Sequence, residues 1–198
     1  MDNLIFRHIK LRELKKIYFE HMTFDFPPSE LPPYKQMRKS IKKNNLKFLI
    51  LTDGKDMLGY VSHTVYSSFG YTLINHLAID KNHRNKGMGK ILLERIHSHV
   101  DSKASIIEVE DPKFAKNDDD KKIVTRRIDF YERDGYELID GNYELFKVPM
   151  RLMLKNLTDE CCKNHFTENK KKVMKELLIQ LYSRYDMNKN IVIERKYI

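Results

Sequence analysis

Residues 76–93 read HLAIDKNHRNKGMGKILL, and this stretch decides the fold. The apolar run Leu73–Ile79 predicts a strand that ends at Asp80, and a helix is expected to begin near Ile91. The first N–H groups of a helix have no intrahelical partner, and the helix dipole attracts negative charge. Glycines in the turn let the backbone approach phosphate oxygens closely. The stretch therefore indicates an anion site, although spacing alone is equally compatible with a helix start after a flexible turn.

Two common phosphate-binding patterns are absent from this turn. A dinucleotide fingerprint needs a third glycine where Leu92 stands, and the Walker pattern does not occur. The anion is therefore not assigned to a dinucleotide or to a P-loop nucleotide.

The rest of the chain predicts an α/β domain with a single mixed, mostly antiparallel central sheet, flanked by helices and followed by a C-terminal helical extension. The expected helices cover residues 11–22, 34–43, 123–133 and 168–185, besides the helix that begins near Ile91. The expected strands cover residues 46–51, 57–66, 71–79, 105–110, 136–139 and 144–148, the last two joined by a turn at residues 140–142. Residues 111–122 are expected to form a polar loop.

Composition favours a globular protein. Hydrophobic residues make up 41% of 198 residues, which is enough for a core, and no run approaches the ~20 apolar residues of a membrane span. The N-terminus lacks the pattern of a signal peptide, so we expect a cytoplasmic protein. Cys161 and Cys162 are adjacent and close no useful loop, and with His165 they lack a fourth ligand, so no metal site is expected.

The formal net charge of +9 is concentrated near the C-terminus. Residues 151–198 carry 11 Lys and Arg against 6 Asp and Glu. A solvated basic tail explains this distribution better than a nucleic-acid surface, although a salt-sensitive nucleic-acid contact through the tail is an alternative.

Two motifs give the chain a resemblance to a known family. Residues 76–93 resemble motif A of the GNAT superfamily of N-acetyltransferases, whose core is R/Q-x-x-G-x-G/A, and residues 127–136, RIDFYERDGY, resemble the end of its motif B. The motifs occur in the family's order with a strand between them. The resemblance covers residues 1–155 and implies an N-acetyltransferase domain there. Residues 156–198 are expected to form a basic helical extension that either packs on the domain or mediates a homodimer.

The resemblance implies that acetyl-CoA is the co-substrate and lies along the end of the third predicted strand. The Leu77 N–H would bind the thioester carbonyl, and the backbone at Ala78 and Ile79 would pair with the pantetheine arm. The cofactor-binding positions of the turn are Arg84, Asn85, Lys86, Gly87, Met88, Gly89 and Lys90. The amides of Asn85 through Lys90 would hold the pyrophosphate, while the cationic side chains of Arg84, Lys86 and Lys90 attract it.

The resemblance also implies that Tyr131 is the general acid that protonates the departing sulfur. A phenol is protonated at neutral pH and can donate, although a ring that only packs on the sheet is the alternative. Strand alternation puts Glu108 and Glu110 on one face, and these carboxylates are the candidate bases. The alternatives are an ion pair with Arg126 or Arg127, or a water molecule as the base.

The acceptor side is expected in an aromatic loop of residues 24–34, because in relatives this loop covers the sheet opposite the cofactor. The predicted substrate-binding residues are Phe24, Phe26, Glu30, Tyr34 and His76. Aromatic and acidic groups suit an amine. A structural role for His76 fits the sequence equally well.

One position departs from the family pattern. Many relatives carry an asparagine seven residues before the tyrosine, where this chain has Val124. The run Asp118–Asp120 beside it either faces a cationic acceptor or belongs to a solvated loop.

The sequence therefore predicts an enzyme that transfers acetyl from acetyl-CoA to a primary amine of a small molecule or peptide. The alternative is a non-catalytic acyl-CoA-binding regulatory module. We expect no membrane or nucleic-acid partner, and the identity of the acceptor amine stays open.

Overall fold

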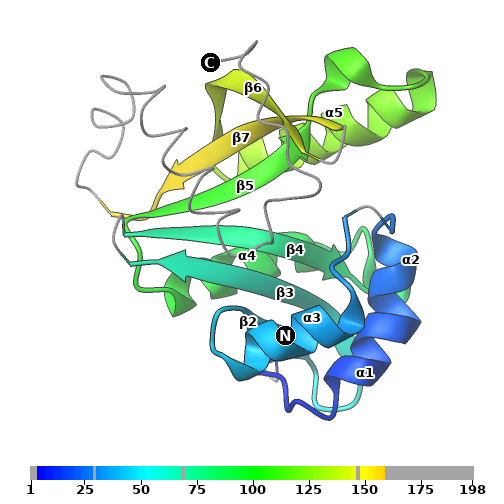
Figure 1. Cartoon of the computed structure of the whole chain (residues 1–198), viewed down its shortest axis with the longest axis vertical. Helices are drawn as coiled ribbons and strands as arrows, with labels where there is room; N and C mark the ends of the chain where they lie inside the picture. The colour runs from blue at the N-terminus through cyan, green and yellow to red at the C-terminus, as the bar shows by residue number, and fades with distance from the viewer. Residues whose placement is uncertain (1–3, 29, 68–69, 146–147, 159–198) are drawn as a thin grey trace. The chain divides into compact units, whose positions relative to one another are not determined.

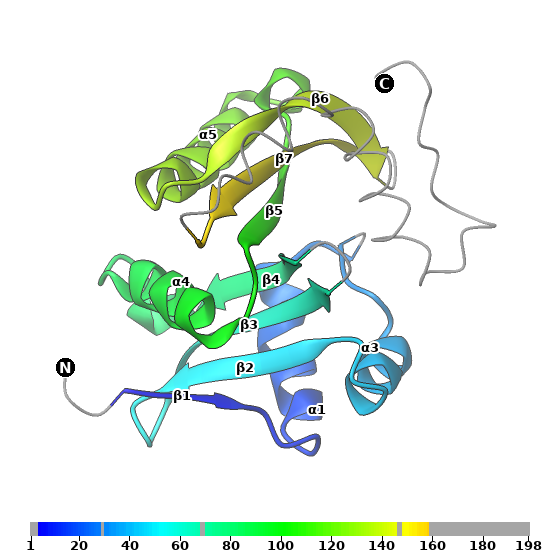
Figure 2. The same cartoon turned by 90° about the vertical axis from the view of Figure 1, so that its left-hand side faces the viewer.

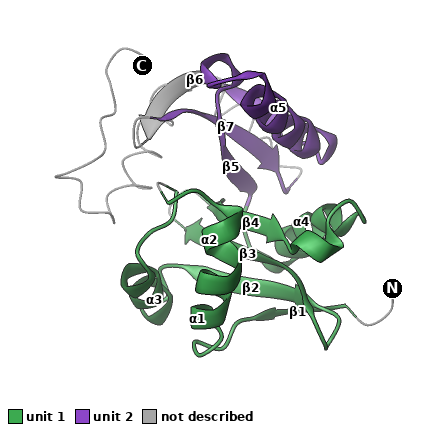
Figure 3. Ribbon diagram, turned by 90° about the vertical axis from the view of Figure 1, so that its right-hand side faces the viewer, with its two compact units in different colours: residues 1–102 green, residues 103–198 purple. Residues whose placement is uncertain are grey.

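The computed structural model describes residues 4–28, 30–67, 70–145 and 148–158, with the backbone alone for 140–145. It divides into two compact units, residues 1–102 and 103–198 (Figure 3). The predicted tail helix, Cys161, Cys162 and His165 lie outside the described residues. The boundary predicted at residue 155 and the homodimer role of the extension stay predictions.

Unit 1 contains a four-stranded sheet in the order β1-β2-β3-β4, with every neighbouring pair antiparallel. The strands are β1 Ile5–His8, β2 Lys47–Thr52, β3 Met57–Tyr66 and β4 Tyr71–Ile79. The predicted turn between β2 and β3 is present, because the Asp53 carboxylate accepts from the N–H groups of Lys55 and Asp56 and Gly54 has a φ of +92°. β1 has no counterpart among the predicted elements.

Helices cover both faces of this sheet, with α1 and α3 on one face and α4 on the other (Figures 1 and 2). One helical stretch comprises α1 Leu14–Ile17, the π-helical turn η1 Tyr18–Met22 and α2 Thr23–Asp25. The remaining helices of unit 1 are α3 Tyr34–Lys42, the 3₁₀ turn η2 Lys81–His83 and α4 Met88–His99.

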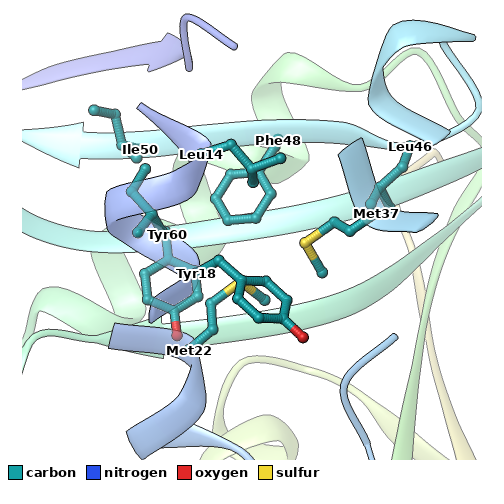
Figure 4. Close-up of a cluster of buried hydrophobic side chains, with 9 residues drawn as sticks. Leu14, Tyr18, Met22, Met37, Leu46, Phe48, Ile50 and Tyr60 are labelled. Atoms are coloured by element: carbon teal, nitrogen blue, oxygen red, sulfur yellow. The ribbon is translucent and has the colours of Figure 1, made fainter. Parts of the chain in front are cut away.

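The first helical stretch packs on the sheet through large apolar side chains (Figure 4). Leu14, Tyr18 and Met22 lie against Phe48 of β2 and Tyr60 of β3, and all five are buried. Removing such surface from water is the main favourable term in folding, at about 25 cal/mol per Å². The packing holds the segment that begins the predicted acceptor loop against the middle of the sheet.

Unit 2 contains a three-stranded antiparallel sheet in the order β5-β7-β6. Its strands are β5 Ala104–Glu110, β6 Glu137–Leu145 and β7 Val148–Asn156, and its helices are the 3₁₀ turn η3 Pro112–Phe114 and α5 Asp118–Arg133. α5 packs against β5 and buries Val124, Ile128 and Tyr131. Gly135 follows α5 with a φ of +90°, as predicted for a glycine that ends a helix.

Two predictions about unit 2 are wrong. Residues 118–122 are not loop, because α5 begins at Asp118: the Asn117 carboxamide accepts from the Asp120 N–H at 2.8 Å and the aspartates lie in the first turn, where the helix dipole favours them. Residues 140–142 do not form a turn between two strands. β6 runs on to Leu145, with an irregularity in its pairing to β7 between Leu138 and Asn142.

The predicted α/β class, with mostly antiparallel strands flanked by helices, is confirmed. Among the described residues, no helix is long and apolar enough to cross a membrane. The cytoplasmic location stays a prediction.

Candidate active site

The turn after β4 has the backbone geometry of an anion cradle. Asn85 and Gly87 both adopt left-handed conformations, with φ of +60° and +76°. Gly87 is the N-cap of α4, and a Cβ built on it would meet nothing within 4 Å. The left-handed φ rather than crowding therefore explains the glycine. Alternation of ordinary and left-handed residues points successive N–H groups to one side of the chain.

The first amides of α4 are available to a ligand. The first helical hydrogen bond is donated by the Ile91 N–H to the Gly87 carbonyl at 3.3 Å, so the N–H groups of Met88, Gly89 and Lys90 precede the intrahelical ladder. α4 is 12 residues long, and its dipole places positive charge at this end. The residues present therefore fit a pyrophosphate.

The cationic side chains of the turn differ in their contacts. The Arg84 guanidinium donates to the Ile79 carbonyl at 3.0 Å and to the Asp25 carboxylate at 2.5 Å. The Lys86 ammonium donates to the Asn82 carbonyl at 2.9 Å, and Lys90 is 3.8 Å from Glu94 on the exposed face of α4. Arg84 is thus held by two contacts although its side chain is 51% exposed, and Lys86 and Lys90 are also exposed enough to attract an anion.

The end of β4 approaches β3 closely. Gly59 of β3 lies opposite Ile79, and a Cβ there would come within 2.7 Å of the Ile79 side chain and 2.9 Å of the Ala78 carbonyl oxygen. Further along, Ser62 pairs with His76 and His63 with Ile74, which leaves Asn75 as an extra residue in β4. Leu77–Ile79, the segment predicted to contact acetyl-CoA, therefore follows the bulge at Asn75 and ends opposite Gly59.

The predicted acid, Tyr131, lies near the C-terminal end of α5 in unit 2. Its side chain is buried, and its ring lies 5.7 Å from that of Tyr136 and 5.2 Å from that of Phe130. Burial raises the pKa of Tyr131 to about 12; the Arg127 charge opposes this rise and the Glu110 charge adds to it. The phenol is therefore protonated throughout the neutral and moderately alkaline range.

The candidate bases are both half-buried on β5. Glu110 accepts from the Arg127 guanidinium at 2.5 Å, so the ion-pair alternative describes the contact that Glu110 makes. Glu108 lies opposite Leu152 of β7. The two carboxylates are two residues apart on the same strand, as alternation predicts.

His76 joins the predicted acceptor loop to the sheet. The Glu30 carbonyl can only accept, at 3.2 Å from Nε2, so Nε2 carries the proton and Nδ1 accepts from the Ser62 hydroxyl at 2.8 Å. The Phe26 ring meets the imidazole edge-on at 5.0 Å. Burial lowers the pKa of His76 to about 4, and the bond to the Glu30 carbonyl opposes this. The geometry is that of a neutral histidine satisfied by its structural partners.

Phe26 and the Glu30 backbone are brought together with His76, whereas the predicted acceptor-side residues Phe24 and Tyr34 have other surroundings. Phe24 is 83% exposed, whereas Tyr34 stacks at an angle on Tyr18 and Phe19, with ring centroids 5.5 and 5.4 Å apart. Glu30 is exposed and meets His76 through its backbone.

Comparison with known proteins decides the family. Residues 44–138 match the family model of the acetyltransferase (GNAT) domain. The chain carries a GNAT acetyltransferase domain. None of the curated protein sequences matches it.

Solved structures share the fold of this GNAT chain. A protein described as an acetyltransferase of the GNAT family from Bacteroides thetaiotaomicron has a TM-score of 0.69 and 23% identity, covering 90% of this chain and 98% of its own. A chimera described as spermidine N-acetyltransferase SpeG from Vibrio cholerae and hSSAT has a TM-score of 0.60 and 15% identity, covering 79% of this chain and 96% of its own. Ard1 from Thermoplasma volcanium has a TM-score of 0.60 and 15% identity, covering 79% and 99%. The predicted GNAT-like fold is confirmed.

The position that departs from the GNAT pattern is a core position. Val124 is buried on the inner face of α5, and the aspartates before it form the first turn of the helix. No long loop therefore separates the start of α5 from Val124.

Four residues that lie around the turn after β4 were not among the predicted site residues: His21, Asp25, Gly59 and Tyr60. Asp25 and Arg84 are 59 positions apart in the chain, and their contact depends on how the first helical stretch packs on the sheet. The sequence could have indicated Gly59, because a glycine inside a strand often marks a close backbone approach.

Proposed function

We propose that this chain is an acetyl-CoA-dependent N-acetyltransferase that moves an acetyl group to a primary amine of a small molecule or peptide. The observation that carries the proposal is the turn of residues 84–90, where two left-handed residues lead into the free amides of α4 within a GNAT domain. In this proposal the turn binds the pyrophosphate of acetyl-CoA, and the backbone of residues 77–79 binds the thioester carbonyl and the pantetheine arm.

Acetyl-CoA supplies the activated acyl group, and the protein supplies binding, polarisation and proton transfer. The Leu77 N–H, as the proposed donor to the thioester oxygen, favours charge that develops on that oxygen during attack. The amine nitrogen forms the new bond to the carbonyl carbon, and the carbon–sulfur bond breaks. Tyr131 gives its phenolic proton to the departing sulfur, so the products are the amide and free coenzyme A.

The amine must lose a proton, because an alkyl amine with a pKa of ~10.4 is mostly protonated at neutral pH. We propose Glu108, Glu110 or a water molecule as the acceptor of that proton. The Arg127 guanidinium donates to one oxygen of Glu110, so in this proposal Glu110 would accept the proton through its other oxygen.

The test is a screen for thiol release with acetyl-CoA against amines of several classes: polyamines, aminoglycosides, amino acids and peptides with free N-termini. Spermidine belongs in the panel because several structures of similar fold are titled as spermidine acetyltransferases. Product amides are identified by mass spectrometry, and a blank without amine measures background hydrolysis.

Thiol release with a matching amide supports the proposal. Tight binding of acetyl-CoA in calorimetry, with no amide from any class, would instead support the non-catalytic acyl-CoA-binding module. Failure to bind coenzyme A at all would overturn both.

A further inference from the structure

The first helical stretch of unit 1 contacts residues on both sides of the 3₁₀ turn η2, which leads into the cradle. From η1, the His21 Nδ1 lies 3.5 Å from the Asp80 carboxylate. From α2, one oxygen of Asp25 lies 2.5 Å from the Arg84 guanidinium. Asp80 follows β4 and Arg84 precedes the left-handed Asn85, so the two contacts bracket the 3₁₀ turn between them.

Asp25 is a largely buried carboxylate with two donors. Its side chain is 11% exposed, and its second oxygen accepts from the Tyr60 hydroxyl at 2.8 Å. Tyr60 is fully buried in β3, and burial followed by the charge of Asp25 raises the pKa of its phenol. A carboxylate removed from water needs such partners. Asp25 is therefore fixed to the sheet before it meets Arg84.

Arg84 connects Asp25 to the start of the cradle. Its Nε donates to the Ile79 carbonyl at 3.0 Å while its terminal nitrogen holds Asp25. One guanidinium thus joins the last residue of β4, the start of the cradle and the helical segment. A planar group with several donors suits this bridging role, because its hydrogen bonds have a fixed relative geometry.

We propose that Asp25 is a positioning residue for the cofactor cradle, and that it acts through Arg84 to hold the turn of residues 84–87 in the shape that receives the pyrophosphate. The inference rests on the proposed function, since it assumes that the anion is the pyrophosphate of acetyl-CoA. Asp25 touches neither the cofactor nor the acceptor in this role.

Because Asp25 is charged, the direction in which its substitution changes coenzyme A affinity tests the proposal. Coenzyme A is a polyanion, and a nearby negative charge repels it. If this Coulomb interaction alone matters, removing the charge should tighten coenzyme A binding. If Asp25 positions the cradle, the same change should weaken binding, because misplaced donors lose their hydrogen bonds to the phosphates.

The experiment compares Asp25→Asn with wild type and with Asp56→Asn, which removes the same charge at an exposed site in the β2–β3 turn. Calorimetry gives the Kd of coenzyme A for each protein. Steady-state assays with an amine found in the screen give kcat/KM for acetyl-CoA and for S-acetylpantetheine, a donor that lacks the pyrophosphate. Thermal melts show whether each variant is folded.

We expect Asp25→Asn to weaken coenzyme A binding and kcat/KM for acetyl-CoA by about tenfold, and to leave kcat/KM for S-acetylpantetheine within about twofold. Asp56→Asn should bind coenzyme A as wild type does. Arg84→Gln should reproduce the loss, and adding Asp25→Asn to it should have no further effect, because both changes break one contact.

Several outcomes would overturn the inference. Tighter binding of coenzyme A by Asp25→Asn would mean that Arg84, once released, serves the phosphate itself. Equal losses with both donors would mean a general structural role for Asp25. If Asp25→Asn does not fold, Arg84→Gln carries the same donor comparison. Absence of coenzyme A binding by wild type would instead refute the proposed function.

Discussion

Tyr131 is the residue whose proposed role depends most directly on its protonation. We expect Tyr131→Phe to lower kcat by about 10²-fold or more while the Kd of coenzyme A changes less than about twofold, because only the donated proton is lost. Thiol-release kinetics and calorimetry measure the two quantities. With its pKa raised to about 12, Tyr131 should cause no loss of kcat with rising pH below about pH 10.

The neighbouring Tyr136 provides the matched control. Its ring contacts Tyr131, and its hydroxyl lies 2.7 Å from the Ser105 hydroxyl in the core of unit 2. Tyr136→Phe should lower the free energy of unfolding by about 1 kcal/mol and leave kcat nearly unchanged. Wild-type kcat in Tyr131→Phe, or an equal loss in both variants, would contradict the acid role.

At the scale of elements, β3 closely approaches the segment of β4 that is predicted to bind acetyl-CoA. We expect Gly59→Ala to destabilise the protein by about 1–3 kcal/mol, because its Cβ would lie 2.9 Å from the backbone oxygen of Ala78 and a strand must shift. The shift should also weaken coenzyme A binding. Urea unfolding and calorimetry measure the two effects.

Gly54→Ala separates stability from cofactor affinity. Gly54 has a φ of +92° with open space around it, so alanine there should cost about 1 kcal/mol through backbone strain alone. Coenzyme A affinity should then stay at the wild-type level. If Gly59→Ala also binds coenzyme A as tightly as wild type, the end of β4 does not take part in binding.

The start of α5 tests the corrected boundary of that helix. The Asn117 side chain caps the helix through the Asp120 N–H. Asn117→Ala should lower the free energy of unfolding by about 1 kcal/mol, and Asn117→Asp by much less, since aspartate also caps well. Equal stability of all three proteins in urea would place the start of α5 further along the chain.

At the scale of the whole molecule, two buried neutral histidines link stability to pH. Burial, together with the charges of His99, His8 and Lys47, lowers the pKa of His63 to about 4, and burial lowers that of His76 to about 4. The unfolded chain, with histidine pKa values near 6.5, takes up protons first as the pH falls. Stability should therefore be complete above pH 6.5 and decline from there to about pH 4, by up to about 3 kcal/mol for each histidine.

His63→Leu isolates one of these contributions. Both ring nitrogens of His63 are buried without a hydrogen-bond partner, so an apolar side chain should be tolerated at pH 7. Urea unfolding between pH 4 and pH 8 should show a shallower decline than in wild type. An unchanged slope would mean that His63 does not titrate with unfolding.

Local sequence was enough to predict much of the chain. The predicted bounds of β3 and β4 are those observed, and the cradle follows them as the motif implies. Alternation, turn residues and a glycine-containing helix start act over a few neighbouring residues, so they can be read without knowledge of the fold. The strand β1, the true start of α5 and the extent of β7 were missed. β1 is short and depends on its pairing with β2, and the aspartates of α5 are typical of both loops and helix starts.

The sequence by itself therefore determined the fold class and the position of the proposed anion cradle, because backbone amides of contiguous residues would make that site. Only the tertiary structure decided which residues far apart in the chain meet. In unit 1, Asp25 meets Arg84 across 59 positions and Gly59 faces the end of β4, and in unit 2 Glu110 of β5 meets Arg127 of α5. Such contacts depend on strand register and on how helices pack over the sheet, which local patterns do not encode.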